Sequence, residues 1–301
     1  MSSSIAKSSQ PPIEIIRRPG RIQLTYWQGV RRRLSRDPIS MVCAGILVLM
    51  IAAAIFAPWV APMDPYKTSM LQRLQPIGTD GHLLGTDELG RDMLSRLIYG
   101  GRVSLLMGLL PIAIATLIGS AFGIVAGFFG CKTNMVIMRI TDVFFAFPSV
   151  LLAVGLAGAL GAGLVNCLVS LAVVFTRAIT RVAESATTQI RNHDFVEAAR
   201  ATGASAPRII VGHVLTNVSS LILTYASSLI SVSIVLASGL SFLGLGIAPP
   251  TADWGLMLNT LRQSIFIAPV NAVMPGIMIL IASICFNLLS DGLRTAMEVK
   301  P

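Results

Sequence analysis

One charged segment, residues 194–203, interrupts a mostly apolar chain, and its residue types suit contact with a partner protein. Asp194 is a favourable N-cap residue, and Glu197 three positions later completes a capping-box pattern that bonds the free amides of a helix start. Gly203 then supplies the left-handed conformation that ends a helix. The spacing predicts a helix of about two turns followed by a sharp turn.

Small side chains suggest what this helix does. Ala198, Ala199 and Ala201 would let it enter a narrow groove on a partner and transmit rigid-body motion. Ser205 is placed to cap a second short helix, with Pro207 in its first turn. The alternative, that these residues only cap and favour helices, stays open from spacing alone.

Hydroxyl side chains recur further along the chain, and they are Ser220, Thr224, Ser227, Ser231, Ser238 and Ser241. Their helical spacing places them on one side of a single helix. Weak hydroxyl contacts would suit a path for peptides, which share a backbone but vary in side chain. Serine and threonine suit a helix–helix interface equally well, so both uses stay open.

Two further patterns favour structure over ligand binding. Gly119, Gly123 and Gly127 recur every fourth residue, which predicts a face where another helix approaches closely. A dense charged cluster comprises Asp87, Glu88, Arg91, Asp92 and Arg96. It is either a docking surface for another protein or a local ion-pair network, and we favour the network because charges so close in sequence commonly cap and pair locally.

Catalytic constellations are absent from the sequence. None of the four lysines follows a glycine, so the chain has no phosphate-binding loop for ATP. It also lacks a G-x-S-x-G elbow and an H-E-x-x-H helix. The four cysteines and three histidines are dispersed, which predicts neither a disulfide framework nor a metal site. We expect no catalytic residue, no metal and no cofactor on this chain, and no enzyme activity.

The elements that position these residues are membrane helices. Hydrophobic residues make up 54% of the chain and charged residues 12%, with a mean hydropathy of +0.75, which excludes an ordinary soluble domain. Uncharged runs cover residues 39–63, 103–131, 143–176, 214–252 and 263–290. Each exceeds the roughly 20 residues that a helical span needs. We expect an all-α polytopic membrane protein.

Glycines at 158, 161 and 163 divide the run 143–176 into two helices, which brings the expected number of spans to six. The first of these helices should begin near Asn134, with Arg139 and Asp142 paired on one face. The run 214–252 is one span followed by a re-entrant or interfacial piece, or two short spans. Its Gly244, Gly246 and 249–250 prolines favour the first.

Basic residues set the orientation. Eight lie in the N-terminal tail: Lys7, Arg17, Arg18, Arg21, Arg31, Arg32, Arg33 and Arg36. Because short cytoplasmic loops collect Lys and Arg, both termini are expected inside, and the net charge of +9 is explained by topology and anionic lipid, without nucleic acid. The expected bounds are a cytoplasmic tail 1–38, disordered to about 26, a first span 39–62, an extracytoplasmic loop 63–102, a transmembrane core 103–292 with a cytoplasmic coupling loop 184–212, and a cytoplasmic tail 293–301.

Several motifs in order carry a family resemblance. Residues 84–96 (LGTDELGRDMLSR) and 101–105 (GRVSL) are followed by AFPS at 146–149, EAA at 197–199, LSFLGLG at 240–246, PP at 249–250, WG at 254–255 and NLLSDGLR at 287–294. Together they resemble C-type permease subunits of the ABC importers for dipeptides, oligopeptides and nickel. One departure is Thr216, where such permeases usually have proline, and its loss should straighten the entry into the fifth span.

The resemblance implies a type I ABC importer fold and a place in the bacterial inner membrane. It implies a second homologous permease, two ATP-binding subunits that hold ATP and Mg²⁺, and an extracytoplasmic solute-binding protein. Glu197, Ala198, Ala199 and Gly203 would then couple to the ATPases. The expected cargo is di- or oligopeptides. Nickel, glutathione or antimicrobial peptides on the same machinery are alternatives, and a stand-alone channel or secondary carrier is less favoured.

Overall fold

The computed structural model describes residues 26–297, which form helices and no β-strand, so the all-α prediction is confirmed. The tail predicted to be disordered up to about residue 26 lies outside the described residues. The helices are α1 Tyr26–Leu34, α2 Pro38–Ile55, α3 Ala57–Val60, η1 Met70–Gln72, α4 Met93–Phe129, α5 Cys131–Phe145, α6 Ser149–Leu160, α7 Leu164–Ile190, α8 Asp194–Ala201, α9 Ala206–Ile209, η2 Ile210–Val214, α10 Leu215–Phe242, α11 Trp254–Leu261, η3 Arg262–Ser264 and α12 Pro269–Met297.

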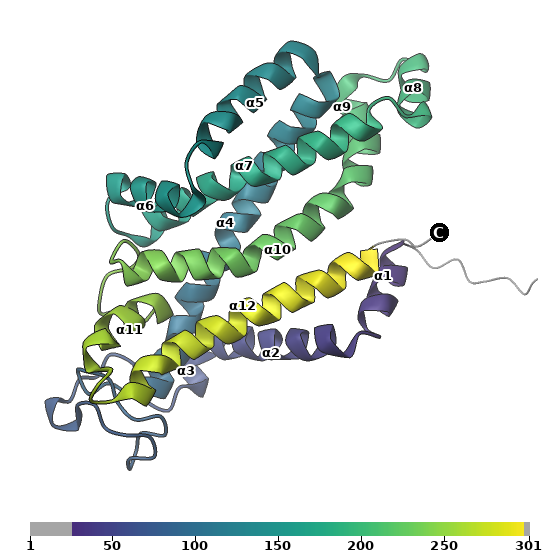
Figure 1. Ribbon diagram of the computed structural model, residues 1–301. Helices are drawn as coiled ribbons and strands as arrows, with labels where there is room; N and C mark the ends of the chain where they lie inside the picture. The colour runs from purple at the N-terminus through teal and green to yellow at the C-terminus, as the bar shows by residue number, and fades with distance from the viewer. Residues whose placement is uncertain (1–25, 298–301) are drawn as a thin grey trace, which may run out of the picture.

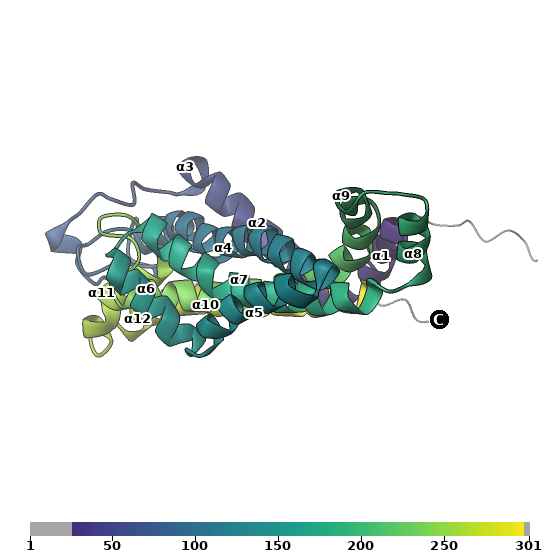
Figure 2. The ribbon, with the colours of Figure 1, turned by 90° about the horizontal axis from the view of Figure 1, so that it is seen from above.

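The long helices lie side by side (Figure 1). α7 packs along α4, α10 lies between α7 and α12, and α2 packs against α12. Both views place α1, α8 and α9 at one end of the molecule, which we call the α8 end. The opposite end, here the loop end, carries residues 61–92 and α11 (Figures 1 and 2).

Among the described residues, five helices are long and apolar enough to cross a membrane, namely α2, α4, α7, the continuous stretch Ala206–Phe242 and α12. The sixth expected span is broken, because α5 and α6 meet at 88°. Pro148 stands at the break as the residue before α6, where a helix cannot continue through its ring. The glycine break between α6 and α7 lies where the sequence predicts it, with Gly161 at φ +88°.

The run 214–252 forms one span, α10, and the chain then leaves the helix through Gly244, at φ +82°, into a loop that leads to α11. A π-helical turn, η2, joins α9 to α10, so the entry into this span is continuous from Ala206 to Phe242. The straighter entry expected from Thr216 stays a prediction. The two-short-span alternative is wrong.

Glycine makes the α4–α7 contact close. A Cβ atom built on Gly119, Gly123 or Gly127 would lie less than 3.0 Å from a backbone carbonyl oxygen of α7. The face is therefore a helix–helix contact in which the two backbones touch. It holds α7, and with it the segment that leads into α8, at a fixed distance from α4.

The start of α2 packs on α12 near the α8 end. Asp37 caps α2 by accepting a hydrogen bond from the Ser40 amide, and the Ser40 hydroxyl donates to the same carboxylate. The hydroxyl bond, helped by the amides of Ser40 and Ile39, holds the pKa of Asp37 below its ordinary value. Gly292 on α12 leaves the room that Ser40 occupies, since a Cβ there would overlap the hydroxyl.

Candidate coupling helix, charged loop and transmembrane polar path

The α8 helix begins one residue earlier than its capping pattern predicts. His193 is the N-cap residue, with no side-chain cap bond, and Asp194 is the first helical residue. The predicted capping box is therefore wrong. Asp194 and Glu197 both lie in the first turn instead, where their charges interact favourably with the positive end of the helix dipole.

The other end of α8 matches the predicted stop. Gly203 has φ +79°, its amide donates to the Arg200 carbonyl (3.0 Å), and the Ala204 amide donates to the Ala199 carbonyl (3.1 Å). This pair of bonds is a Schellman motif. Ser205 is the N-cap residue of α9, but its side chain makes no cap bond.

One face of α8 packs inward and the other is open. Val196 and Ala199 belong to the main core cluster and are 0% and 9% exposed. Glu197 and Ala198 are exposed. The expectation that Ala198 and Ala199 share an outward face is wrong, because Ala199 anchors the helix. Arg200 lies over the Phe128 ring, 5.2 Å from its centre, which ties α8 to the end of α4.

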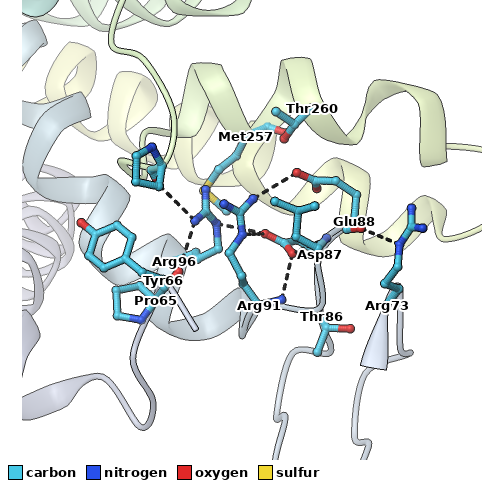
Figure 3. A network of polar contacts seen from close by, with 12 residues as sticks. Pro65, Tyr66, Arg73, Thr86, Asp87, Glu88, Arg91, Arg96, Met257 and Thr260 are labelled. Carbon is cyan, nitrogen blue, oxygen red and sulfur yellow. Dashed lines mark hydrogen bonds and ion pairs between the residues drawn. The ribbon is translucent and has the colours of Figure 1, made fainter. Parts of the chain in front are cut away.

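At the loop end, Asp87 is the centre of a buried ion-pair network (Figure 3). Its carboxylate accepts from Arg91 Nε at 2.6 Å and lies 3.2 Å from Arg96 Nε. Arg91 also pairs with Glu88 at 3.1 Å, and Arg96 donates to the Pro65 carbonyl. The preference for a local network is confirmed, since Asp87, Arg91 and Arg96 are each less than 5% exposed.

Asp92 connects this network to the membrane helices. It caps α4 by accepting from the Ser95 amide at 2.8 Å, and its other oxygen lies 3.0 Å from His82 Nδ1. Because of this cap, α4 begins at Met93, inside the stretch 63–102 that the sequence assigns to a loop. The charged cluster is thus the rigid N-terminal support of the longest helix.

Sequence reasoning missed Arg177, which holds the α5–α6 bend. Arg177 is 7% exposed, and its guanidinium donates to the carbonyls of Phe144 and Phe147 and to the Ser149 hydroxyl. It also lies over the Phe145 ring, 4.7 Å from its centre. A helix break inside a bilayer frees carbonyl groups that lipid cannot satisfy, and Arg177 satisfies them.

The expected Arg139–Asp142 pair is not formed. Asp142 instead accepts from Arg181 Nη1 at 2.8 Å, with side chains that are 47% and 58% exposed. The α7 helix passes close to this part of α5, so a tertiary partner replaces the local one. A pair as exposed as this adds little stability.

Replacing Arg177 by methionine is expected to destabilise the protein strongly. Each carbonyl left without a donor in a buried site costs about 1–3 kcal/mol. The Arg177→Lys variant keeps the charge but not the planar fork of donors, so its loss of stability should lie between those of wild type and Arg177→Met. Arg181→Met, one turn further along α7, is the matched control and should cost no more than about 1 kcal/mol. Thermal unfolding of the purified protein measures all three, and equal midpoints for the two methionine variants would contradict this role.

The hydroxyl stripe of α10 divides between packing and open space. Ser227 contacts Ser290 of α12 with 2.8 Å between hydroxyl oxygens, and Ser238 and Ser241 are buried against the segment 246–255. Ser220 and Thr224 line one cavity, and Ser231 lines another. The stripe therefore packs against neighbouring segments at some positions and lines a cavity at others, and its use as a path for peptides stays a prediction.

The described residues contain no group of three or more His, Cys, Asp or Glu side chains arranged to hold a metal ion. All four cysteines are free thiols, three of them buried. The described residues instead offer an exposed short helix at one end, a rigid charged loop at the other, and cavities between long apolar helices that polar side chains partly line.

Comparison with known families defines the class. Residues 119–300 match the family of binding-protein-dependent transport system inner membrane components, and residues 25–76 match the N-terminal transmembrane domain of oligopeptide transport permease C. The chain belongs to the first of these families. It is a multi-pass inner-membrane permease subunit of an ABC importer, and the resemblance drawn from its motifs is confirmed.

Individual relatives share almost the full length. The glutathione transport system permease protein GsiD of Pectobacterium atrosepticum is 37% identical over 276 residues, which cover 92% of both chains. The proteins of the same name from Escherichia coli O6:K15:H31 and Shigella boydii serotype 4 are 38% identical, over 92% of this chain and 91% of theirs.

Proposed function

We propose that this chain forms half of the membrane pathway of an importer for short peptides, glutathione among them. The observation that carries the proposal is the full-length similarity to permeases named for glutathione transport, together with an N-terminal segment of the oligopeptide permease type. Glutathione is itself a tripeptide, so one pathway suited to short peptides accounts for both. A second, homologous permease would form the other half.

The energy source lies in other subunits under this proposal. Two ATP-binding subunits hold ATP and Mg²⁺, and they engage the α8 end through Glu197, Ala198 and the turn at Gly203. Support comes from the form of α8, which is fixed inward by Val196 and Ala199 while Glu197 and Ala198 are exposed. A short helix anchored in this way moves with the spans that it joins.

The loop end receives the solute-binding protein in this arrangement. Buried ion pairs make the loop rigid, yet it presents apolar side chains at its surface, with Leu71 95%, Leu83 67% and Met70 66% exposed. Exposed apolar groups on a rigid support suit a docking surface. The loop end is then extracytoplasmic and both termini are cytoplasmic, in keeping with the basic residues near the N-terminus.

Reconstitution tests the proposal directly. The chain, its partner permease and the two ATPases are placed in proteoliposomes, and labelled glutathione and dipeptides are supplied with the cognate binding protein. We expect ATP-dependent uptake of at least one of these peptides and none with ADP. Uptake that proceeds without ATP, or no uptake of any peptide by an assembled and ATP-hydrolysing complex, would contradict the function.

A further inference from the structure

Two cavities follow the seam between α10 and α12. The first, which we call the end cavity, has a volume of about 400 Å³ and lies toward the α8 end among α7, α10 and α12. The second, the middle cavity, also has a volume of about 400 Å³ and includes Ser231 and Asn287 in its wall. Ser228 lines both, so the two cavities adjoin each other along this seam.

The wall of the end cavity combines apolar side chains with a set of polar and charged ones. Its chemistry-bearing groups are the side chains of Ser220, Thr224, Tyr225 and Ser228 from α10, and of Asp291 and Arg294 from α12. Side chains three residues apart share one face of a helix, about 5–6 Å apart at Cβ. A carboxylate and a guanidinium therefore stand together at the edge of a hydroxyl-lined space.

The polar and charged groups of these two walls do not suit contact with lipid. Hydroxyl, amide and charged groups on spanning helices normally face a protein interior or water, because hydrocarbon cannot solvate them. The end and middle cavities gather these groups along one seam of two otherwise apolar helices. The seam is thus suited to a hydrated solute.

Three of the hydroxyl groups along the two cavities are already engaged as donors. Thr224 donates to the Ser220 carbonyl at 2.8 Å, Ser228 to the Tyr225 carbonyl at 2.7 Å, and Ser231 to the Ser228 carbonyl at 3.0 Å. Their oxygens keep acceptor capacity, so a solute makes contacts without leaving an unsatisfied donor when it departs. Transport requires this balance, since a site that binds too tightly does not release.

We propose that Asp291 and Arg294, with the hydroxyl wall of the end cavity, bind the two charged termini of a short zwitterionic peptide. Asp291 accepts from the ammonium group and Arg294 donates to the carboxylate. Two extended residues span at most about 7 Å, which is comparable with the Cβ spacing of about 5–6 Å between residues three apart on a helix. The inference rests on the proposed function and goes further, because it assigns the residues and the chemical class that they recognise.

Cysteine protection tests the site without the binding protein, whose own selectivity would otherwise dominate. The assembled, detergent-purified complex carries Cys131→Ser, which removes the exposed native thiol, and Ser228→Cys as a reporter. Labelling by a small maleimide is timed with dialanine, or with its N-acetylated and C-amidated form. Dialanine should slow labelling about threefold at twice its Kd, while the blocked peptide should leave the rate unchanged.

Charge-removing variants test whether Asp291 and Arg294 bind the peptide termini. Asp291→Asn and Arg294→Gln should each abolish protection by dialanine, whereas Lys132→Gln, at the start of α5 and outside both cavities, should retain it. A reporter at Ser185→Cys, exposed on α7 and outside the cavity wall, should label at one rate with or without peptide. Because the comparison of free and blocked dialanine uses unaltered Asp291 and Arg294, it stands even if a charge variant fails to assemble.

The outcomes are separable from those of the proposed function. Suppose that the complex imports peptides but that dialanine, even at its solubility limit, does not change the labelling rate. That result would overturn this inference alone. Equal protection by free and blocked dialanine would also overturn it, because the termini would then not be recognised. A complex that assembles and imports no peptide would overturn the proposed function and this site with it.

Discussion

Replacing Glu197 by lysine is expected to reduce both ATPase co-purification and ATP-driven uptake by more than about tenfold. A reduction of this size is typical when a like-charge contact forms, or a contact is lost, at a protein interface. Glu197 is exposed in the first turn of α8, so its replacement leaves the core untouched. A lysine there also opposes the helix dipole, which costs about 0.3–1 kcal/mol of local helix stability. Affinity purification and proteoliposome uptake measure the two losses.

Two controls separate coupling from general damage. Glu197→Gln keeps the size and removes the charge, so its loss should lie between those of wild type and Glu197→Lys. Gln189→Lys adds the same charge on the exposed surface of α7, before α8 begins, and should leave assembly intact. Normal uptake by a complex carrying Glu197→Lys would remove Glu197 from the coupling surface.

Gly203 should behave like Glu197 for a different reason. A β-branched side chain at φ +79° is strained, so Gly203→Val would open the Schellman turn and reorient α8. Gly212 is the matched control, because it is exposed, has free space around its Cβ position and has no left-handed backbone. We expect Gly203→Val to release the ATPases and Gly212→Val to retain them.

Replacing Asp87 by asparagine is the second change with a large expected effect. The substitution keeps the shape but leaves two buried guanidinium groups, those of Arg91 and Arg96, without their shared carboxylate. Breaking a buried pair from one side typically costs about 3–5 kcal/mol. We expect a lower thermal unfolding midpoint, less protein in the membrane, and a loop whose cleavage by protease is faster.

Asp80 provides the matched control. It lies in the same loop and carries the same charge, but it is exposed. Asp80→Asn should therefore change neither the unfolding midpoint nor the membrane level. If Asp87→Asn unfolds at the same temperature as Asp80→Asn, the ion-pair network contributes far less to the stability of the protein than its burial implies.

Local patterns predicted much of this molecule. The apolar runs identified the five unbroken spans of the described residues, because length and hydrophobicity alone decide whether a helix can cross a bilayer. The recurrence of glycine at every fourth residue predicted the face of α4 that packs closely on another helix, and Gly203 predicted the end of α8. Both sequence signals depend only on residues within one or two helical turns. The charged loop was also correctly interpreted as a network, since its partners are close in sequence.

Features set by distant contacts were not predicted. Ala199 was expected outward, but the packing of α8 on the core, rather than any local signal, decides which face is buried. Asp142 pairs with Arg181 instead of Arg139 because α7 lies alongside α5. The end cavity required knowledge that the last turns of α12 lie beside α10. The one available hint was a charged pair, Asp291 and Arg294, just beyond an apolar run.

The bend between α5 and α6 constrains how the protein is made. Its freed carbonyl groups cannot remain bare in hydrocarbon, and their donor, Arg177, lies on the helix that is synthesised next. Arg177 in turn is costly in the bilayer until it meets those carbonyls. Because neither part satisfies its polar groups alone, we expect α5, α6 and α7 to leave the insertion machinery and enter the lipid together.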